Sequence, residues 1–448
     1  MKAIQAFMEK YFVPFAAKLG SMKVLIAIRD AFIGTMPATM AGSIAVMINA
    51  IIRDLPTAFN PAYDGNSIPV IREIIGVNGF MWQGTLAIAG IIFAVSWGYN
   101  LSRTFGQDGL AGALVGLASL IMGIAFAVPA DPATGFEGAW GWLKLGHMGA
   151  MSYFTTMILG GLALAIYIIL MKRNITIKLP DSVPPAVSKA FTSIIPATAG
   201  LYVVAIIYYI FSNTIGANGL FVIDWVSDVI AAPLLTLSQG YGAVALITIL
   251  VSVLWFFGLH GPNILAPVLE GIWGVAQLAN VNTFQEGGLD AVMKGIENGT
   301  AFAWVRGSFD AYAWFGGSGG TITLIIAIFL FSKRADYKTV AKLGVGPGVF
   351  NINEPVMFGL PIVLNPIMFI PFFLAPLVAT SIGYFATVLG LVNPVTQQVV
   401  WVVPPFLLSF LATQDWRAVI VTAITFAASF AIYAPFVLAA NSQEEAEI

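Results

Sequence analysis

The sequence predicts an all-α membrane protein that crosses the bilayer many times. Hydrophobic residues make up 58% of the 448 residues and charged residues only 9%, whereas a soluble domain carries about 25% charged residues. Long stretches are also continuously apolar and free of charge, and a helix needs about 20 such residues to cross a hydrocarbon core of roughly 30 Å. We therefore expect lipid around most of the surface.

Composition excludes several classes of function. The chain has no Cys and two His, so disulfides, thiolate nucleophiles and His-rich metal clusters are excluded. No metal or other cofactor is expected. The net charge of −2 provides no basic field for nucleic acid, so no nucleic-acid partner is expected. Glu9 and Lys10 interrupt the first 20 residues, which do not form a secretory signal.

Charge-free windows locate the predicted crossings. They are residues 31–52, 74–102, 109–130, 145–171, 190–223, 229–269, 311–332, 355–414 and 418–443. As one helix, the window 355–414 would be about 90 Å long, so it must fold back on itself. The windows together predict roughly nine to eleven crossings.

Basic residues follow directly after two of these windows and place those loops in the cytoplasm. The basic residues are Lys172, Arg173 and Lys178, then Lys333, Arg334, Lys338 and Lys342, with Lys10, Lys18 and Lys23 near the N-terminus. Counting crossings from a cytoplasmic N-terminus places Arg103 inside, and Asp131 and Glu137 outside.

Two amphipathic helices are predicted on the membrane surface. The apolar face of the first consists of Met8, Tyr11, Phe12 and Phe15. The second starts after Pro180-Asp181-Ser182, and its apolar stripe consists of Val183, Val187, Phe191 and Ile194. Because the second helix divides the chain near its middle, we expect a first membrane domain in 1–180, this linker helix with the fifth span in 181–223, and a second membrane domain in 224–448.

Glu354 is a candidate functional residue because it stands where glycines and prolines interrupt a helix, from Gly346-Pro347-Gly348 to Pro361. Broken backbone at membrane depth is tolerated only where protein buries it or a cavity is lined, and transporters build substrate sites from such breaks. Asn353 and Glu354 offer donors and acceptors suited to hydroxyl groups. The alternative is that Glu354 caps a short helix with Pro355 at its first position.

His260 is a second candidate, because Gly258, Gly261 and Pro262 interrupt the helix around it. The nearby Trp255 fits a carbohydrate site, in which an indole face packs on a sugar ring beside a few polar groups. The alternative is a core histidine with satisfied hydrogen bonds.

Other polar groups receive structural interpretations. Arg29 and Asp30 are expected to pair at the membrane interface, and His147 is also expected there. Glu270 and Asp310 lie near loop ends and are as readily exposed as buried. The glycines of 316–320 lack the Lys-Ser/Thr of a phosphate loop, so they indicate a helix break or close helix packing.

Segments along the whole chain, in order, follow one pattern. They are AIRDAF at 27–32 with Met36-Pro37, KLPDSVPPAV at 178–187, WFFGLHG at 255–261, FSKRADY at 331–337, and INEPVMFGLP at 352–361 with Asn365-Pro366. Together they resemble the IIC subunits of bacterial phosphotransferase-system sugar permeases, in the lactose/cellobiose/diacetylchitobiose branch.

This resemblance implies ten transmembrane helices, two re-entrant hairpins, amphipathic connecting helices and a homodimer formed largely by the N-terminal half. It implies a β-linked disaccharide in the C-terminal half, with Glu354 and His260 binding its hydroxyls. The other residues that the resemblance assigns to the sugar site are Asn353, Trp255 and Trp401, with Gln83, Gly84 and Thr85 from the second span.

The mechanism implied is group translocation across the bacterial cytoplasmic membrane. The C-terminal domain carries the sugar inward by a rigid-body, elevator-like motion. A separate IIB subunit, which carries phosphate on a cysteine and works with a IIA subunit, then phosphorylates the C6 hydroxyl. Because this chain has no Cys, we expect the donor to be another polypeptide that docks on the basic cytoplasmic loops. Glu354 and His260 would be the catalytic residues, orienting the hydroxyl and easing loss of its proton. The chain itself takes part in phosphoryl transfer only within that complex.

Two rival functions remain open. One is a proton-driven secondary transporter with Glu354 as the proton carrier, and the other is a passive channel or receptor. The sugar is also open, because cellobiose, diacetylchitobiose and lactose differ in one acetamido group or one epimeric centre. The linker with Pro184-Pro185 leans toward cellobiose or a related β-glucoside.

Overall fold

The computed structural model describes most of the chain. The described residues are 18, 21–54, 56, 57, 60, 62–128, 138–180, 182–360, 362 and 366–444. Several positions used in the predictions lie outside them: the apolar face of the first amphipathic helix, Glu9, Lys10, Asp131, Glu137, Asp181, Pro361 and Asn365.

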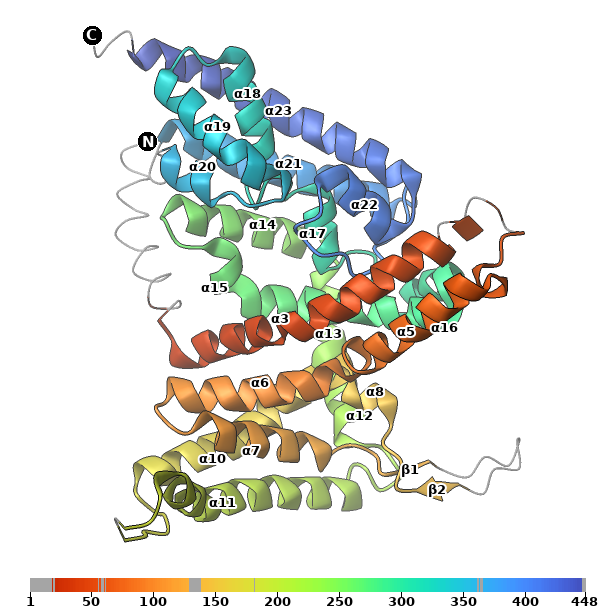
Figure 1. The fold of residues 1–448 in the computed structure, drawn as a ribbon, viewed down its shortest axis with the longest axis vertical. Helices are drawn as coiled ribbons and strands as arrows, with labels where there is room; N and C mark the ends of the chain where they lie inside the picture. The colour runs from red at the N-terminus through yellow and green to blue at the C-terminus, as the bar shows by residue number, and fades with distance from the viewer. Residues whose placement is uncertain are drawn as a thin grey trace. The chain divides into compact units, whose positions relative to one another are not determined.

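The described part of the chain is mostly helical, as predicted (Figure 1). Within it, seven helices are long and apolar enough to cross a membrane, or eight if the bent pair Val222–Ser238 and Tyr241–Phe256 counts as one span. The seven are Lys23–Arg53, Pro69–Thr104, Ala150–Lys172, Val187–Asn213, Gly261–Asn298, Ile370–Val388 and Trp416–Asn441. The polytopic helical class is thus confirmed, while the number of about ten crossings and the two re-entrant hairpins stay predictions.

Two predicted spans are shorter than expected. The window 109–130 contains α7 (Gly109–Ile121), whose 13 residues cover only about 20 Å. The window 311–332 contains α18 (Thr321–Phe331). This helix begins late because Gly316, Gly317 and Gly320 have φ values of 76°, 101° and 66°, a left-handed conformation that glycine adopts readily. The predicted helix break at these glycines is confirmed.

The window 355–414 folds back, as its length required. It holds most of α20 (Glu354–Gly359), all of α21 (Pro366–Val388) and α22 (Pro405–Thr413). The stretch 389–404 between α21 and α22 has no regular helix, so its backbone groups need partners elsewhere in the protein.

The chain forms two compact units. Among the described residues, unit 1 consists of 43–79 and 235–444, and unit 2 consists of 18–42 and 80–234. Three helices contribute residues to both units: α3 (Lys23–Asn49), α5 (Pro69–Gln83) and α13 (Ala232–Ser238). The remaining elements of unit 2 are η4 (Leu86–Ile88), α6 (Ala89–Thr104), α7, the strands β1 (Ala127–Val128) and β2 (Ala139–Trp140), α8 (Leu145–Met148), η5 (Ala150–Ser152), α9 (Tyr153–Thr155), η6 (Thr156–Gly160), α10 (Gly161–Lys172), α11 (Pro185–Asn213), α12 (Val222–Val226) and η7 (Ser227–Ala231).

Unit 2 is built from closely packed helices. α6 packs against α7, and α10 packs along α11 (Figure 1). Glycines allow the α6–α7 contact, since a Cβ atom at Gly116 would lie 2.6 Å from the carbonyl oxygen of Ala94. Small residues of this kind let membrane helices approach closely. α11 begins at Pro185 and runs unbroken through the predicted linker into the fifth span. The expected ion pair forms between Arg29 and Asp30, with Nη2 and Oδ1 at 2.7 Å.

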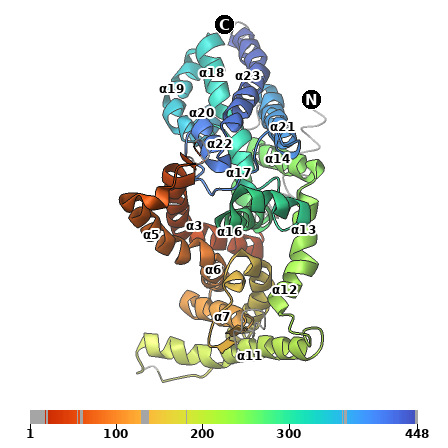
Figure 2. The same cartoon turned by 90° about the vertical axis from the view of Figure 1, so that its right-hand side faces the viewer.

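Unit 1 is a helical bundle around an aromatic core. Its remaining elements are η2 (Ala50–Asp54), η3 (Gly65–Ser67), α14 (Tyr241–Phe256), α15 (Gly261–Val268), η8 (Leu269–Gly274), α16 (Val275–Asn298), α17 (Arg306–Tyr312), α18, α19 (Ala335–Val349), α20, α21, α22 and α23 (Trp416–Glu444). α23 packs against α18, α21 and α22, and α14 packs on α21 (Figure 2). The buried rings of Trp304, Phe309, Tyr312 and Phe372 fill the interior.

Side-chain amides provide hydrogen-bond partners for the backbone of the non-helical stretch that precedes α17. Gln239 donates to the carbonyl oxygen of Trp304 at 2.9 Å and accepts from its N–H at 2.8 Å. Asn280 does the same for Phe302, with both distances 2.8 Å. Buried backbone must be paired in a protein interior and above all in a membrane. The two amides therefore supply the backbone hydrogen bonds that a neighbouring β-strand would otherwise provide.

Candidate functional site

His260 lies where α14 gives way to α15. Gly258, with a φ of 73°, turns the chain after α14, and His260 is the residue that caps α15. Its Nδ1 accepts a hydrogen bond from the N–H of Asn263 at 3.2 Å. A neutral imidazole that accepts at Nδ1 carries its proton on Nε2. The fold therefore presents Nε2–H as a donor.

Glu354 lies next to that donor. α19 ends at Val349, and Glu354 is the first residue of α20, with Pro355 next. The predicted break in the helix is confirmed, although Pro347 is accommodated in the last turn of α19. The Oε1 atom of Glu354 lies 3.5 Å from Nε2 of His260, and their side chains are 45% and 36% exposed. The two principal candidates thus meet, although the sequence separates them widely, and both remain accessible.

Trp255 packs against the imidazole of His260. Its ring centroid lies 4.5 Å from that of His260 and 6.2 Å from that of Phe358. The Trp255 side chain is only 1% exposed, so in this structure it does not offer an open face. Its Nε1–H has no hydrogen-bond partner among the described residues. Phe358, which the sequence did not single out, is 64% exposed beside the pair.

Asn353 is buried against the glycine turn that precedes α18. Its Nδ2 lies 3.5 Å from the hydroxyl oxygen of Ser318. A Cβ atom at Gly317 would lie 2.5 Å from the Cβ and Cγ atoms of Asn353. Glycine is therefore required at 317 both by this contact and by its left-handed φ. Asn353 is placed next to Glu354 but makes its contacts in the protein interior.

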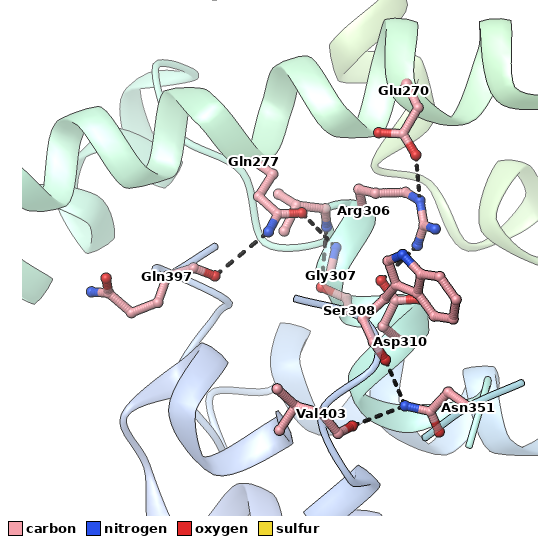
Figure 3. A network of polar contacts seen from close by, with 11 residues as sticks. Glu270, Gln277, Arg306, Gly307, Ser308, Asp310, Asn351, Gln397 and Val403 are labelled. Atoms are coloured by element: carbon pink, nitrogen blue, oxygen red, sulfur yellow. Dashed lines mark hydrogen bonds and ion pairs between the residues drawn. The ribbon is translucent and has the colours of Figure 1, made fainter. Parts of the chain in front are cut away.

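Trp401 is connected to the same loop through Asn351, a residue that the sequence reasoning did not single out. The Nδ2 of Asn351 donates to the carbonyl oxygen of Trp401 at 2.6 Å and to that of Val403 at 2.9 Å (Figure 3). Its Oδ1 accepts from the N–H of Gly316 at 2.9 Å. The Trp401 side chain is 37% exposed. Its position within a glycine- and proline-rich break was the signal available in the sequence.

A partly buried charge cluster lies in the same unit and connects α17, which carries Arg306 and Asp310, to η8, which carries Glu270 (Figure 3). Arg306 donates from Nε to Glu270 at 2.9 Å and from Nη1 to Asp310 at 2.8 Å. Its guanidinium also lies 4.8 Å from the ring centroid of Trp314. Glu270 and Asp310, whose exposure the sequence left open, therefore share one cation. Arg306 was not predicted to be important, because nothing next to it in the sequence reveals its partners.

The last three predicted site residues belong to unit 2. Gln83 ends α5, and Gly84 and Thr85 connect it to η4. The hydroxyl of Thr85 donates to the carbonyl oxygen of Met81. Among the described residues, no group of three His, Asp or Glu side chains is arranged to hold a metal ion.

His147, which the sequence analysis expects at the membrane interface, has a side chain that is fully buried within the protein. Its Nε2 lies 2.9 Å from Oδ1 of Asp224. Its Nδ1 accepts from the N–H of Ala125 at 3.4 Å, and Lys144 lies 3.2 Å from the same carboxylate. Its partner, Asp224, is distant in the sequence and lies in α12.

The fold and the site together define a multi-pass membrane protein with a polar pair at two interrupted helices, the arrangement typical of a small-solute transporter. Known proteins agree. The family described as "Phosphotransferase system, EIIC" matches residues 29–376. The cellobiose-specific EIIC component of Lactococcus lactis subsp. lactis is 47% identical over 100% of both chains. The oligo-beta-mannoside-specific EIIC component of Bacillus subtilis is 32% identical over 96% of this chain and 92% of its own length.

A solved structure also matches. The crystal structure of ChbC, the IIC component of the N,N'-diacetylchitobiose-specific phosphotransferase system, superimposes with a TM-score of 0.86 at 31% identity, over 98% of this chain and 99% of that one. The chain belongs to the EIIC family of the sugar phosphotransferase system and is an integral membrane protein. Whether the predicted residues bind sugar stays a prediction.

Proposed function

We propose that this chain is the permease of a phosphoenolpyruvate-dependent sugar phosphotransferase system and carries a β-linked disaccharide into the cell. Cellobiose or a related β-glucoside is the favoured substrate, with diacetylchitobiose next. The names of the relatives support this class of sugar. The observation that carries the proposal is the contact between His260 and Glu354 at 3.5 Å, because it offers an oriented donor and a carboxylate acceptor to one hydroxyl group.

The proposed chemistry couples transport to phosphorylation by a separate IIB subunit, itself supplied by IIA. The C6 hydroxyl oxygen of the sugar attacks the phosphorus of the IIB phosphocysteine. The new O–P bond forms as the S–P bond breaks, and the cysteine leaves as a thiolate. The hydroxyl proton passes to the Glu354 carboxylate or to water. Glu354 and His260 would orient the hydroxyl, and the basic residues Lys338 and Lys342 on α19 would meet the incoming partner.

A homodimer and an elevator-like motion complete the proposal. Residues 1–180 would begin the dimerisation scaffold, 181–223 would form the linker and fifth span, and 224–448 would carry the sugar. The division between the two units falls within α13, close to residue 224, and supports this organisation. Unit 1 also takes residues 43–79, which the proposal assigns to the scaffold. Light scattering of the purified protein in detergent tests the dimer.

The first test is a binding titration of the purified protein with cellobiose, diacetylchitobiose and lactose, using wild type and Glu354→Ala. We expect saturable binding of one disaccharide, and loss of that binding in the variant. Wild-type protein that is folded but binds none of the three would overturn the sugar assignment. Uptake by vesicles with phosphorylated IIB then tests coupling. An uncoupler should leave that uptake unchanged, whereas uptake that stops would favour a proton-driven carrier with Glu354 as the proton site.

A further inference from the structure

Asn351 occupies an unusual place in the chain. It follows α19 and stands two residues before Asn353 and three before Glu354. Its φ of 62° lies in the left-handed region, which Asn tolerates better than most residues. The side chain is 7% exposed. A polar side chain buried to this extent needs hydrogen-bond partners.

The carboxamide of Asn351 finds partners on two other interrupted segments. Its oxygen accepts from Gly316, in the turn before α18, and its nitrogen donates to Trp401 and Val403, in the stretch between α21 and α22. Both hydrogens of the amide nitrogen and one lone pair of the oxygen are used. Because neither segment is helical, these bonds replace the backbone pairing that a helix would supply.

Asn351 therefore joins three segments that carry proposed sugar-site residues or pack on them. It donates a hydrogen bond to Trp401 and accepts one from Gly316. Gly316 adjoins Gly317, which packs on Asn353. Glu354 lies three residues after Asn351 in the same loop. We propose that Asn351 is a positioning residue for the sugar site: its amide holds the Trp401 segment to the loop of Asn353 and Glu354. This inference rests on the function proposed above.

The competing explanation is general structural support without an effect on the site. The chain offers a matched control for it in Asn441, whose side chain makes the same type of bridge elsewhere in unit 1. Asn441 donates to the carbonyl oxygen of Phe331 at 2.9 Å and accepts from the N–H of Lys333 at 2.8 Å. Neither partner belongs to the proposed sugar site.

The test compares Asn351→Asp with Asn441→Asp. Aspartate at 351 keeps an acceptor for Gly316 but turns an oxygen toward the carbonyls of Trp401 and Val403. Asn351→Gly is the second variant, because glycine keeps the left-handed backbone while it removes the amide. We expect both variants at 351 to fold and to bind the disaccharide about tenfold more weakly than wild type. Asn441→Asp should bind it with wild-type affinity.

A double-mutant cycle separates positioning from general support. Trp401→Phe removes the indole but leaves the carbonyl oxygen that Asn351 contacts. If Asn351 acts by positioning Trp401, Asn351→Asp should weaken binding much less in the Trp401→Phe background than in wild type. An equal loss in both backgrounds, or wild-type affinity of the folded Asn351 variants, would overturn the proposal.

Two further readouts keep the inference distinct from the proposed function. If wild type binds no disaccharide, the proposed function fails first and this inference fails with it. If wild type binds but the Asn351 variants are unaffected, only this inference fails. If neither variant folds, hydrogen exchange in wild type decides. The Gly316 amide should be protected with and without sugar. Rapid exchange of this amide in the sugar-bound protein would contradict the proposed positioning role of Asn351.

Discussion

The Nε2 atom of His260 lies 3.5 Å from the Oε1 atom of Glu354, and this contact joins the interruption after α14 to the one before α20. The distance is longer than an ordinary N–H···O hydrogen bond of roughly 2.7–3.2 Å. Each group therefore keeps capacity to bind a hydroxyl that comes between or beside them. Both side chains are presented by residues that start a helix, which fixes their direction.

The first prediction concerns coupling within this pair. His260→Gln and Glu354→Gln should each weaken disaccharide binding about tenfold, because each removes a hydrogen bond to a charged or oriented group. The double variant should lose less than the sum, because the two residues are in contact. Calorimetric titration measures all three, with Glu73→Gln, a 78% exposed carboxylate, as the control. Strictly additive losses would show that the two groups act independently.

The second prediction concerns Arg306, whose side chain is 17% exposed. Arg306→Gln leaves Glu270 and Asp310 without their shared cation, so we expect the free energy of unfolding to fall by about 1.5–3 kcal/mol. The control is Arg334→Gln, which disturbs the contact between Arg334 and the 53% exposed Asp336 and should change stability by less than about 1 kcal/mol. Thermal unfolding in detergent makes the comparison. Equal shifts for the two variants would contradict a structural role for this partly buried cluster.

The third prediction is a pH dependence from His147. Burial lowers the pKa of its imidazole below the ordinary value of 6.5, and although Asp224 opposes this effect, Lys144 adds to it. The unfolded chain then takes up the proton more readily than the folded one. The stabilising contribution is complete above pH 6.5 and is lost as the pH falls toward the folded pKa, at no more than about 1.4 kcal/mol per pH unit.

Unfolding temperatures of wild type between pH 7.5 and 5.5 check this dependence. His147→Gln should show a smaller decrease on acidification than wild type. His260→Gln, which removes the other histidine of the chain, should keep the wild-type decrease. If the decrease in unfolding temperature survives in His147→Gln and disappears in His260→Gln, His147 is not its source.

The fourth prediction uses the same substitution in two helices. Gly116→Ala places a methyl group 2.6 Å from the Ala94 carbonyl oxygen, so α6 and α7 must separate and stability should fall by about 1–3 kcal/mol. Gly76→Ala, inside α5, meets nothing within 4 Å and should gain up to about 1 kcal/mol from helix propensity. Unfolding experiments on both variants should therefore give opposite signs. The same sign for both would argue against a close α6–α7 contact.

The helical membrane class and the helix breaks could be predicted from the sequence, because each depends on local composition. Charge depletion extends over the whole chain, and glycines or prolines mark the breaks before α18 and before α20. The end of α7 at Ile121 could not be predicted, since the residues that follow are equally free of charge. Helix length there depends on the turn into β1, which hydropathy does not report.

The contacts at the site were harder to predict, because their partners are distant in sequence. Asn351 and Trp401 are separated by 50 residues, and Gly316 and Asn351 by 35. A buried amide or imidazole has no periodicity that would show which backbone it meets. The interrupted helices pointed to Glu354 and His260 from the sequence, and the family resemblance added Trp401 and residues 83–85. The contacts of Asn351 and Arg306 emerged only from the folded structure.

The hydrogen bonds of Gln239 and Asn280 to the backbone of Trp304 and Phe302 limit which sequence changes this region can accept in evolution. Surface loops ordinarily accept inserted or deleted residues. Here Phe302 and Trp304 are each hydrogen-bonded through both their N–H and their carbonyl oxygen. Shifting the chain by one position would therefore place a different residue's backbone opposite each amide. The stretch 299–305 should accept new side chains where these point away from the core. It should not accept a change in length.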